Sequence, residues 1–383
     1  MPPTLSLFTS TGVCPAHTYS AVKNPKSTIE NPKSGRPAIK CVVWDLDNTL
    51  WPGIAAEGEV DATPEPDAGM LRIIYELEAR GIVSSVASRN DPGLGERLLA
   101  HPLLAGRFVA PQVGWEPKSQ AVRRIAERLN IGVDAMAFVD DSPFERAEVT
   151  YMAPEVMVLS PEEMKEAVKG PAFNPGRVTE EARRRAGMYR AEEERRAAEE
   201  GFGGSRTDFL AWCEMRLGIA HATLEDLERL AEMTERTHQL NSTGRRYSIE
   251  ELEECIRSER WLVPAARLTD RFGDYGLIGA AVVDKEAPWP PGVWLAELVM
   301  LSCRVEGRGI PAALLIWLMR EALDAGIHAL RAVYRKDERN LPIRLLFRQL
   351  GFTTIGGDNM VLVSRDLTQP LQAYPEWLAV NGE

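Results

Sequence analysis

The first half of the chain alternates short apolar runs with longer stretches of mixed polar and apolar residues. Apolar runs over residues 41–44 and 82–90, and a third beginning at residue 135, are typical of buried strands in a parallel sheet. Between the first two runs, the pattern predicts a turn-rich loop over residues 52–67 and one helix over residues 68–80. This alternation predicts an α/β fold built on a parallel sheet.

A highly charged segment separates this first half from a second half with a different pattern. Residues 179–204 are dense in Glu, Arg and Ala, with opposite charges three or four apart, which predicts a helix. A solvated connecting helix is the simpler interpretation, and a coiled-coil or partner-binding helix is the alternative. Beyond it, the pattern predicts a strand over residues 291–301, a helix over residues 311–325 and a strand over residues 328–334.

The charged helix divides the chain into two folded halves. A length of 383 residues exceeds the size at which a single core usually stops growing. We therefore predict a loose tail over residues 1–36, a first domain over 37–175, a helical linker over 176–220, a second domain over 221–370 and a C-terminal tail over 371–383.

Composition and charge exclude several classes of protein. The net charge of −11 argues against general affinity for nucleic acid, because the phosphate backbone favours clustered Lys and Arg. No run reaches the roughly eighteen apolar residues that a membrane helix needs, and no secretory signal is recognisable. We therefore expect a cytoplasmic protein that binds no membrane. The five cysteines are scattered without metal-type spacing, which argues against a disulfide framework or a zinc site.

Two carboxylates one residue apart, Asp45 and Asp47, follow the first apolar run. The carboxyl ends of parallel strands form the edge at which open α/β folds bind their ligands. In this position the first carboxylate can take up a phosphoryl group. The second can give a proton to the leaving oxygen and later accept one from water. Taken alone, an Asp-x-Asp pair is also typical of an ordinary polar turn after a strand.

Suitable partners for this pair follow the next predicted strands. Ser88 ends the second run and offers a hydroxyl to a phosphate oxygen. Lys118 supplies a single cation that can neutralise a transferring group. Asp140 and Asp141 end the third run and are hard oxygen ligands suited to magnesium. Strand–helix alternation would gather these residues at one edge, so the sequence predicts metal-assisted phosphoryl transfer through an aspartyl phosphate.

These segments resemble the four motifs of the haloacid dehalogenase (HAD) superfamily. The resemblance implies that Asp45 is the nucleophile and Asp47 the general acid/base. The expected phosphate-binding residues are Asn48, Thr49, Ser88, Arg89 and Lys118, and the expected magnesium ligands are Asp45, Asp47, Asp140 and Asp141. The stretch between Asp47 and Ser88 has room for one loop and one helix only. We therefore expect no large cap domain and an open site.

Glycines and arginines follow the strand predicted over residues 291–301. Arg304, Gly307, Arg308 and Gly309 form a turn before the next predicted helix, where bare backbone N–H groups can meet a pyrophosphate. Together with the strand and the LGF segment that follow, this turn resembles the acyl-CoA loop of the GNAT acetyltransferase fold. The alternative is that the glycines only allow a tight turn.

The whole order of motifs resembles the FkbH-like proteins, which join a HAD phosphatase to a GNAT-like domain. The segments that carry this resemblance are DLDNTLW, SRND, FVDDSPFER, QLNSTGRRYS, RFGDYGLIG and LSCRVEGRG. It implies loading of a glyceryl group onto an acyl carrier protein in polyketide-type biosynthesis. The implied donor is 1,3-bisphosphoglycerate, the cofactor is Mg²⁺, and the phosphopantetheine arm of the carrier is a co-substrate.

The same resemblance makes Cys303 a second catalytic residue. It implies that the Cys303 thiolate takes a phosphoglyceryl group as a thioester, after which the site at Asp45 removes its phosphate. Neighbouring arginines and a helix N-terminus are surroundings that activate a thiol. The alternative is that Cys303 simply packs at the end of a strand, since free cysteines are often buried.

Two further groups of residues are candidates for the second half. The expected pantetheine- or acyl-binding residues are Asn241, Thr243, Arg245, Arg246, Arg304, Gly307, Arg308 and Gly309, and His238 lies in the same segment as the first four. A basic face for docking an acidic carrier is expected from Arg304, Arg308, Arg331, Arg335, Lys336, Arg339, Arg344 and Arg348. A merely solvated arginine-rich face is the alternative.

Two other functions compete with glyceryl loading. One is a stand-alone magnesium-dependent phosphatase whose C-terminal half is a non-catalytic binding module. The other is a CoA-dependent N-acyltransferase. The position of Cys303 directly before the glycine turn argues mildly against the second, because direct transfer from CoA to an amine needs no thiol intermediate.

Overall fold

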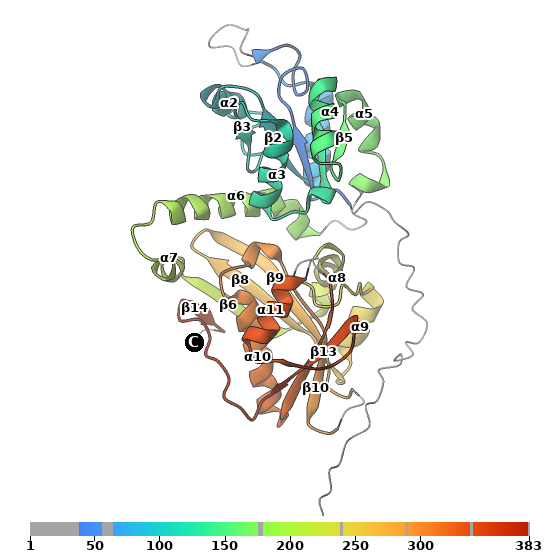
Figure 1. Ribbon diagram of the computed structural model, residues 1–383, viewed down its shortest axis with the longest axis vertical. Helices are drawn as coiled ribbons and strands as arrows, with labels where there is room; N and C mark the ends of the chain where they lie inside the picture. The colour runs from blue at the N-terminus through green and yellow to red at the C-terminus, as the bar shows by residue number, and fades with distance from the viewer. Residues whose placement is uncertain are drawn as a thin grey trace, which may run out of the picture. The chain divides into compact units, whose positions relative to one another are not determined.

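The structure of the protein is a computed structural model that describes residues 38–55, 64–174, 179–237, 240–287, 290–337 and 340–381 (Figure 1). All of these residues belong to one compact unit. They form one parallel sheet and a second, mixed sheet with helices packed on them, which confirms the predicted α/β class. Across these described ranges, no helix combines the length and the apolar character needed to cross a bilayer.

The first sheet has five parallel strands in the order β3-β2-β1-β4-β5. They are β1 (Cys41–Trp44), β2 (Val83–Ser88), β3 (Gln112–Val113), β4 (Met136–Val139) and β5 (Met157–Leu159). The helices of this half are α1 (Ala68–Ala79), α2 (Pro92–Leu99), α3 (Lys118–Leu129), α4 (Pro143–Met152) and α5 (Pro161–Ala167). Strands β1 and β2 and helix α1 therefore lie where the sequence pattern predicts them, to within two residues.

Strand β1 is buried on both faces, which explains its uninterrupted apolar sequence. Val42 and Trp44 pack into one core, whereas Cys41 and Val43 pack into another, because successive side chains of a strand point to opposite faces. Helices α1 and α5 pack against each other on the first of these faces, and α3 and α4 on the second. Helices on both faces are what a purely parallel sheet requires.

The direction in which strands are added to the sheet reverses beside β1. The chain proceeds outward from β1 to β2 and β3, and then returns to place β4 on the other side of β1. Ligands of open α/β sheets bind outside the carboxyl ends of the strands at such a reversal. Asp45 and Asp140, which directly follow β1 and β4, therefore lie where this topology favours a site.

Helix α6 (Glu180–Glu200) follows the first sheet and precedes α7 (Arg206–Trp212). The interpretation of α6 as a solvated connecting helix does not hold for one of its faces, because Tyr189, Glu192 and Arg195 are buried. Glu192 accepts a hydrogen bond from Arg195 (2.7 Å) and forms an ion pair with Arg308. One of the charged residues that predicted α6 thus also pairs the helix with Arg308, which lies outside it.

The second sheet has nine strands, in the order β12-β13-β11-β10-β9-β8-β6-β14 with β7 paired to β9. The strands are β6 (Met215–His221), β7 (Trp261–Leu262), β8 (Pro264–Asp270), β9 (Gly273–Asp284), β10 (Val293–Leu301), β11 (Ala329–Arg335), β12 (Thr353–Gly356), β13 (Met360–Asp366) and β14 (Leu378–Val380). The helices are α8 (Leu227–Arg236), α9 (Ile249–Arg257), α10 (Ile310–Asp324) and α11 (Leu341–Gln349). The three elements predicted between residues 291 and 334 correspond to β10, α10 and β11.

Two of the predicted domain boundaries need correction. Strand β6 pairs with β8, so the second sheet begins at Met215, inside the predicted linker 176–220. Strand β14 lies inside the predicted tail 371–383, yet it pairs with β6 and places Leu378 beside Met215. A three-residue strand has no periodicity to detect, and its pairing with a strand far away in the sequence is a tertiary feature.

Strands β10 and β11 pair in parallel only as far as Ala296. Beyond that point, residues 240–243, here called the 240–243 segment, connect the two strands. The Ser242 N–H donates to the Val299 carbonyl (2.9 Å), and the Ser242 carbonyl accepts from the Arg335 N–H (2.8 Å). The segment therefore fills the opening between the strands and satisfies backbone groups that their divergence leaves unpaired.

Candidate functional site

Asp45 follows the last residue of β1, and its backbone N–H continues the sheet by donating to the Val139 carbonyl of β4 (2.9 Å). Its buried carboxylate forms an ion pair with Lys118, the first residue of α3. The Lys118 ammonium also donates to the Ala87 carbonyl (2.6 Å) and lies 3.3 Å from Asp140. One buried lysine therefore faces the carboxylates that follow the two central strands.

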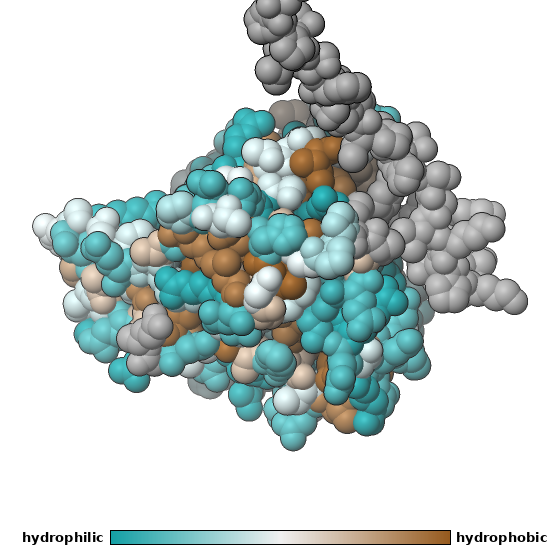
Figure 2. All heavy atoms as spheres, turned by 90° about the horizontal axis from the view of Figure 1, so that it is seen from below, coloured by the Kyte–Doolittle hydropathy of each residue, from teal (hydrophilic) through white to brown (hydrophobic). Residues whose placement is uncertain are grey.

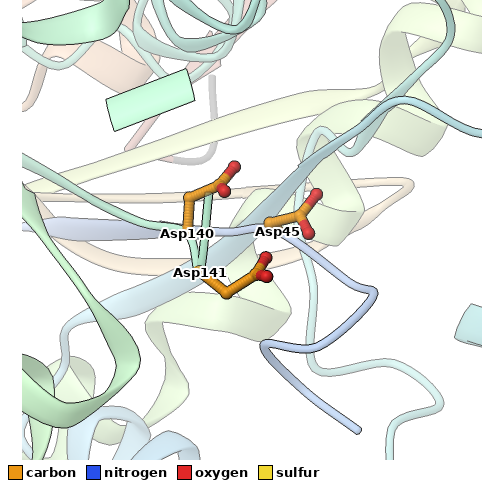
Figure 3. Close-up of side chains that lie close together, drawn as sticks. All are labelled: Asp45, Asp140 and Asp141. Carbon is orange, nitrogen blue, oxygen red and sulfur yellow. The ribbon is translucent and has the colours of Figure 1, made fainter. Parts of the chain in front are cut away.

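Three carboxylates meet at this edge of the sheet (Figure 3). Oxygens of Asp45, Asp140 and Asp141 lie within 4.8 Å of one another. Asp140 Oδ2 is buried and accepts no hydrogen bond, although the Lys118 ammonium lies 3.3 Å away, so this oxygen is available to coordinate a cation. Hard carboxylate oxygens are the ligands that magnesium prefers, so these residues fit Mg²⁺. Together with Lys118, they are called the Asp45 site below.

The electrostatics of the Asp45 site also favour a cation. Burial raises the pKa of Asp45 to about 6, and the neighbouring charge of Asp140 adds to the increase although Lys118 opposes it. The pKa of Asp141 is raised as well, first by burial and then by Asp140. Close carboxylates resist ionising together, and a divalent cation between them would relieve this repulsion.

The carboxylate of Asp47 is held apart from this cluster. Its Oδ1 accepts hydrogen bonds from Trp51 Nε1 (3.0 Å) and the Ala55 N–H (2.8 Å), and its Oδ2 accepts from Asn90 Nδ2 (2.9 Å). Three donors thus fix its orientation. Asp47 was expected among the magnesium ligands, but the acidic cluster found in the described residues does not contain it.

Ser88 is the last residue of β2, and Asn90 lies two positions after it at the same edge of the sheet. Both side chains are buried, and Asn90 donates to Ser88 Oγ (3.1 Å) as well as to Asp47. Asn90 was missed as a site residue, although it lies two positions after Ser88 in the quoted SRND motif. Arg89, expected to bind phosphate, instead forms an ion pair with Glu145 (2.9 Å).

Asn48 and Thr49, also expected to bind phosphate, hold neighbouring backbone in the structure. Asn48 has a left-handed backbone (φ 54°), and its side-chain oxygen accepts from the Gly53 N–H (2.9 Å). The buried Thr49 hydroxyl accepts from the Asp141 N–H (3.1 Å). These contacts shape the turn after β1 and connect it to the loop after β4.

Glu148 is a second residue that the sequence analysis missed. It lies on α4, and its carboxylate accepts hydrogen bonds from the backbone and the hydroxyl of Ser119, next to Lys118. Nothing in the sequence marks Glu148, because its role depends on the packing of α4 against α3. Pattern analysis detects residues at strand ends more readily than residues that support them.

The glycine turn predicted before α10 is present. Gly307 (φ 76°) and Gly309 (φ 83°) have left-handed backbones, and Gly309 is the N-cap residue of α10. A Cβ on Gly309 would lie 2.7 Å from Pro375 Cγ, so packing also requires glycine there. Cys303 begins the 3₁₀ turn η5 (Cys303–Val305), and its side chain lies outside the described part of the structure.

The two arginines of this turn differ in environment. Arg308, expected to contact the acyl or pantetheine group, has a side chain that is only 2% exposed and is paired with Glu192. That expectation is corrected, because the guanidinium is directed into the protein. Arg304 is half-buried, and its Nε donates to Ser302 Oγ (3.2 Å).

The residues expected near position 241 make structural contacts. Asn241 Oδ1 accepts hydrogen bonds from the Thr243 N–H (3.2 Å) and the Gly244 N–H (2.7 Å), which closes the turn at the end of the 240–243 segment. Arg245 forms ion pairs with Glu297 (2.9 Å) and Glu251 (3.4 Å). Arg246 is exposed, and His238 lies outside the described residues.

The predicted basic docking face is smaller than its sequence cluster. Arg308 is buried, and Arg339 lies outside the described residues. Figure 2 shows one face of the molecule, on which hydrophobic side chains interrupt a mostly hydrophilic surface. Leu345 of α11, beside Arg344 in the sequence, is 53% exposed. The predicted docking residues therefore include a buried arginine and have an exposed leucine among them in the sequence.

The chain matches no protein-family model and no curated protein sequence. Among solved structures, it is similar to the N-terminal part of the protein BF1531 from Bacteroides fragilis, containing a phosphatase domain complexed with Mg, with 29% identity and a TM-score of 0.30. This match covers 34% of the chain and only 39% of the B. fragilis chain. The chain is also similar to the ribosomal-protein-S18-alanine N-acetyltransferase from Escherichia coli, with 16% identity, a TM-score of 0.31, and coverage of 40% of this chain and 96% of that one. It is similar as well to an N-acetyltransferase from Staphylococcus aureus Mu50, with 18% identity and a TM-score of 0.31. That match covers 39% of this chain and 98% of the S. aureus chain.

Proposed function

We propose that the first half of the chain is a magnesium-dependent phosphatase of the HAD type and that the second half is an acyltransferase domain. The observation that carries the first proposal is the buried arrangement of Asp45, Lys118 and Asp140 at the carboxyl ends of β1 and β4. In this arrangement Asp45 provides a nucleophile, and Lys118 provides the positive charge that a phosphoryl group needs.

In the proposed reaction, an Asp45 oxygen attacks the phosphorus of a phosphate ester. The bond from phosphorus to the leaving oxygen breaks as Asp47 gives that oxygen a proton. Water then attacks the same phosphorus while Asp47 takes its proton, which frees Asp45 and releases inorganic phosphate. Lys118 stabilises the charge of the phosphoryl oxygens throughout. Bound Mg²⁺ would be held by Asp45, Asp140 and Asp141 and would supply further charge neutralisation.

For the second half, we propose the glyceryl-loading reaction that the sequence motifs imply. The Cys303 thiolate attacks the acyl carbon of 1,3-bisphosphoglycerate, the bond to the 1-phosphate breaks, and inorganic phosphate leaves. The remaining phosphate ester is hydrolysed at the Asp45 site. Finally, the phosphopantetheine thiol of an acyl carrier protein attacks the thioester carbonyl, which frees Cys303 and leaves glyceryl on the carrier.

Exposed aromatic side chains support a substrate presented on a larger partner. Trp115 and Phe144 are 74% and 71% exposed. In the sequence, Trp115 shortly precedes Lys118 and Phe144 shortly follows Asp141. Aromatic side chains are enriched where proteins meet.

The phosphatase is tested by hydrolysis of p-nitrophenyl phosphate with Mg²⁺. We expect Asp45→Asn to lower kcat on the order of a thousandfold or more, as for other essential nucleophiles. Asp358→Asn, an exposed aspartate in a bend of the second half, is the matched control and should keep the unmodified rate. Comparable rates for Asp45→Asn and the unmodified protein would eliminate the proposed nucleophile.

The acyl transfer is tested by intact-protein mass spectrometry. The protein, Cys303→Ala and the control Cys255→Ala are incubated with freshly generated 1,3-bisphosphoglycerate and Mg²⁺, with and without a phosphopantetheinylated carrier. We expect a glyceryl or phosphoglyceryl adduct on the unmodified protein and on Cys255→Ala, and its transfer to the carrier. Release of phosphate with no adduct on any of the three proteins would leave a phosphatase alone.

A further inference from the structure

A cavity of about 420 Å³ lies away from the Asp45 site. Lys40, just before β1, and Asp134 and Ala135, just before β4, line one side of it. These residues lie at the amino ends of the strands whose carboxyl ends hold Asp45 and Asp140. The cavity and the Asp45 site are therefore at opposite edges of the first sheet. Residues of α6, α8 and the turn at Cys303 complete the wall: Arg185, Tyr189, Arg229, Met233, Arg236, Ser302 and Arg304.

Positive side chains outnumber carboxylates around this cavity. Its lining contains Lys40, Arg185, Arg229, Arg236 and Arg304, but only two acidic residues, Asp134 and Glu155. One more carboxylate, that of Glu232, is buried behind the lining, where Arg229 (2.8 Å) and Arg185 (2.5 Å) both donate to it. Five cations thus surround three carboxylates, which leaves an excess of positive charge.

The carboxylate of Glu232 is paired with Arg229 and Arg185. Burial would raise the pKa of Glu232, but the charges of Arg229 and Arg185 outweigh burial and lower it to about 2. Its Oε2 also accepts from the Thr179 hydroxyl (2.7 Å). This carboxylate therefore stays ionised, and it accepts hydrogen bonds from Arg229, Arg185 and Thr179.

Arg236 is the group that this network leaves incompletely satisfied. Its Nη1 is buried and has no hydrogen-bond partner, and it lies 3.9 Å from Glu232 Oε1, too far for a hydrogen bond. Burial, followed by the like charge of Arg185, lowers the pKa of Arg236 to about 9. A buried donor that lacks a partner is costly, and an anion in the cavity would supply one.

We propose that this cavity binds a small phosphorylated molecule, with Arg236 donating to its phosphate. A phosphate monoester carries nearly two negative charges near neutral pH, which suits a lining with more cations than carboxylates. Guanidinium groups present donors in the geometry that phosphate oxygens accept. Ile131, Val133 and Met233 offer apolar contact for a short carbon skeleton. The inference does not depend on the proposed reactions.

The cavity lies next to the segment that contains Cys303. Ser302 and Arg304, the two neighbours of Cys303 in the sequence, both line the cavity. A phosphorylated molecule held there would therefore lie beside the backbone of this residue, on the far side of the first sheet from the Asp45 site.

The test is a calorimetric titration of the full chain with inorganic phosphate, in EDTA and at constant ionic strength set with chloride. We expect saturable binding, with Kd raised at least tenfold in Arg236→Gln. Arg216→Gln, an exposed arginine of β6 that does not line the cavity, is the matched control and should bind phosphate like the unmodified protein.

Two further measurements separate this cavity from the Asp45 site. Lys118→Met removes the cation of the Asp45 site and should leave the phosphate Kd of the cavity unchanged. Arg236→Gln should hydrolyse p-nitrophenyl phosphate with Mg²⁺ at the unmodified rate. If only Lys118→Met lost binding, the phosphate would be at the Asp45 site and the inference would be overturned.

Other outcomes also decide the inference. Equal phosphate affinity of Arg236→Gln and the unmodified protein would overturn it, and acetate binding as tightly as phosphate would overturn the phosphate assignment. If circular dichroism shows that Arg236→Gln fails to fold, Lys40→Met replaces it, because the Lys40 ammonium donates to the Arg236 carbonyl (2.9 Å) and lines the same cavity. This variant should also raise Kd at least tenfold.

Discussion

The carboxylate of Glu148 accepts two hydrogen bonds from Ser119, one from its backbone N–H (3.0 Å) and one from its hydroxyl. The N–H groups of the first turn of a helix have no partner within the helix, so this contact satisfies one of them from outside. Ser119 directly follows Lys118, and α4 directly follows the loop of Asp140 and Asp141. Glu148 therefore connects the helix that carries the site's lysine to the helix beside its carboxylates.

This contact makes Glu148 a positioning residue for Lys118. We expect Glu148→Ala to lower the kcat for p-nitrophenyl phosphate about tenfold with a smaller change in KM, because the lysine acts mainly on charge that develops in the transition state. Glu148→Gln should recover part of the rate, since its amide oxygen can still accept from the Ser119 N–H. Glu127→Ala, on an exposed part of α3, is the control, and an equal loss there would contradict the assignment.

Magnesium should stabilise the fold as well as support activity. Binding to the native state alone raises the free energy of unfolding by about 2.7 kcal/mol at a concentration one hundred times Kd. We therefore expect Mg²⁺ to raise the Tm of the unmodified protein and EDTA to abolish hydrolysis. Asp140→Asn should lose most of the Tm increase. An undiminished increase in this variant would place the metal elsewhere.

The raised pKa of Asp45 predicts a pH-dependent stability in the absence of metal. The native state holds the Asp45 proton up to about pH 6, whereas the unfolded chain releases it near pH 4. The free energy of unfolding should therefore fall as pH rises through this window. Relative to Asp45→Asn, which cannot ionise, the unmodified protein should lose up to about 3 kcal/mol between pH 4 and pH 7.

Urea unfolding in EDTA at several pH values measures this difference. Added Mg²⁺ should reduce it, because the metal favours the ionised carboxylate. A difference between the two proteins that stays constant from pH 4 to pH 7 would be incompatible with a raised pKa at Asp45.

Glu192 should be important for stability. Glu192→Ala leaves the buried Arg308 guanidinium without its carboxylate, and breaking such a pair typically costs about 3 kcal/mol or more. Burial opposes ionisation of Glu192, but the Arg195 hydrogen bond and the charge of Arg308 outweigh it and lower its pKa. The stabilisation should therefore persist above the ordinary pKa of glutamate and disappear as pH falls below it.

Urea unfolding of Glu192→Ala and of Glu194→Ala tests this prediction. Glu194 is exposed on the same helix, so its loss should change stability by about 0.5 kcal/mol or less. Similar losses in the two variants would show that the Arg308 pair contributes no more than a surface charge.

The local sequence pattern was sufficient to predict elements that are marked by their own residues. The apolar residues of β1 and the carboxylates that follow it predicted a parallel strand and its edge, because burial on both faces leaves an uninterrupted apolar run. Burial explains the errors as well. Arg308 looked like a ligand-binding residue beside glycines, but its environment depends on Glu192, more than one hundred residues earlier.

Supporting residues were the hardest to predict. Asn90 orients Asp47, and Glu148 holds the residue after Lys118, but each acts through a contact between different elements. Pattern analysis finds a strand-end aspartate because its type and position suffice, whereas a supporting side chain is defined only by what it touches. Strand β14 was missed within the predicted tail for the same reason, because its pairing with β6 has no local signal.

The pairing of β6 with β14 has a consequence for the order of folding. Leu378 lies beside Met215, and Asn381 Oδ1 accepts a hydrogen bond from the Ile219 N–H (2.6 Å). Strand β6 thus has a partner that a ribosome synthesises only after all the other strands of the second sheet. Contacts between residues so far apart in sequence form slowly. During synthesis, the first sheet can therefore form while β6 still lacks the strand at residues 378–380 that pairs with its edge.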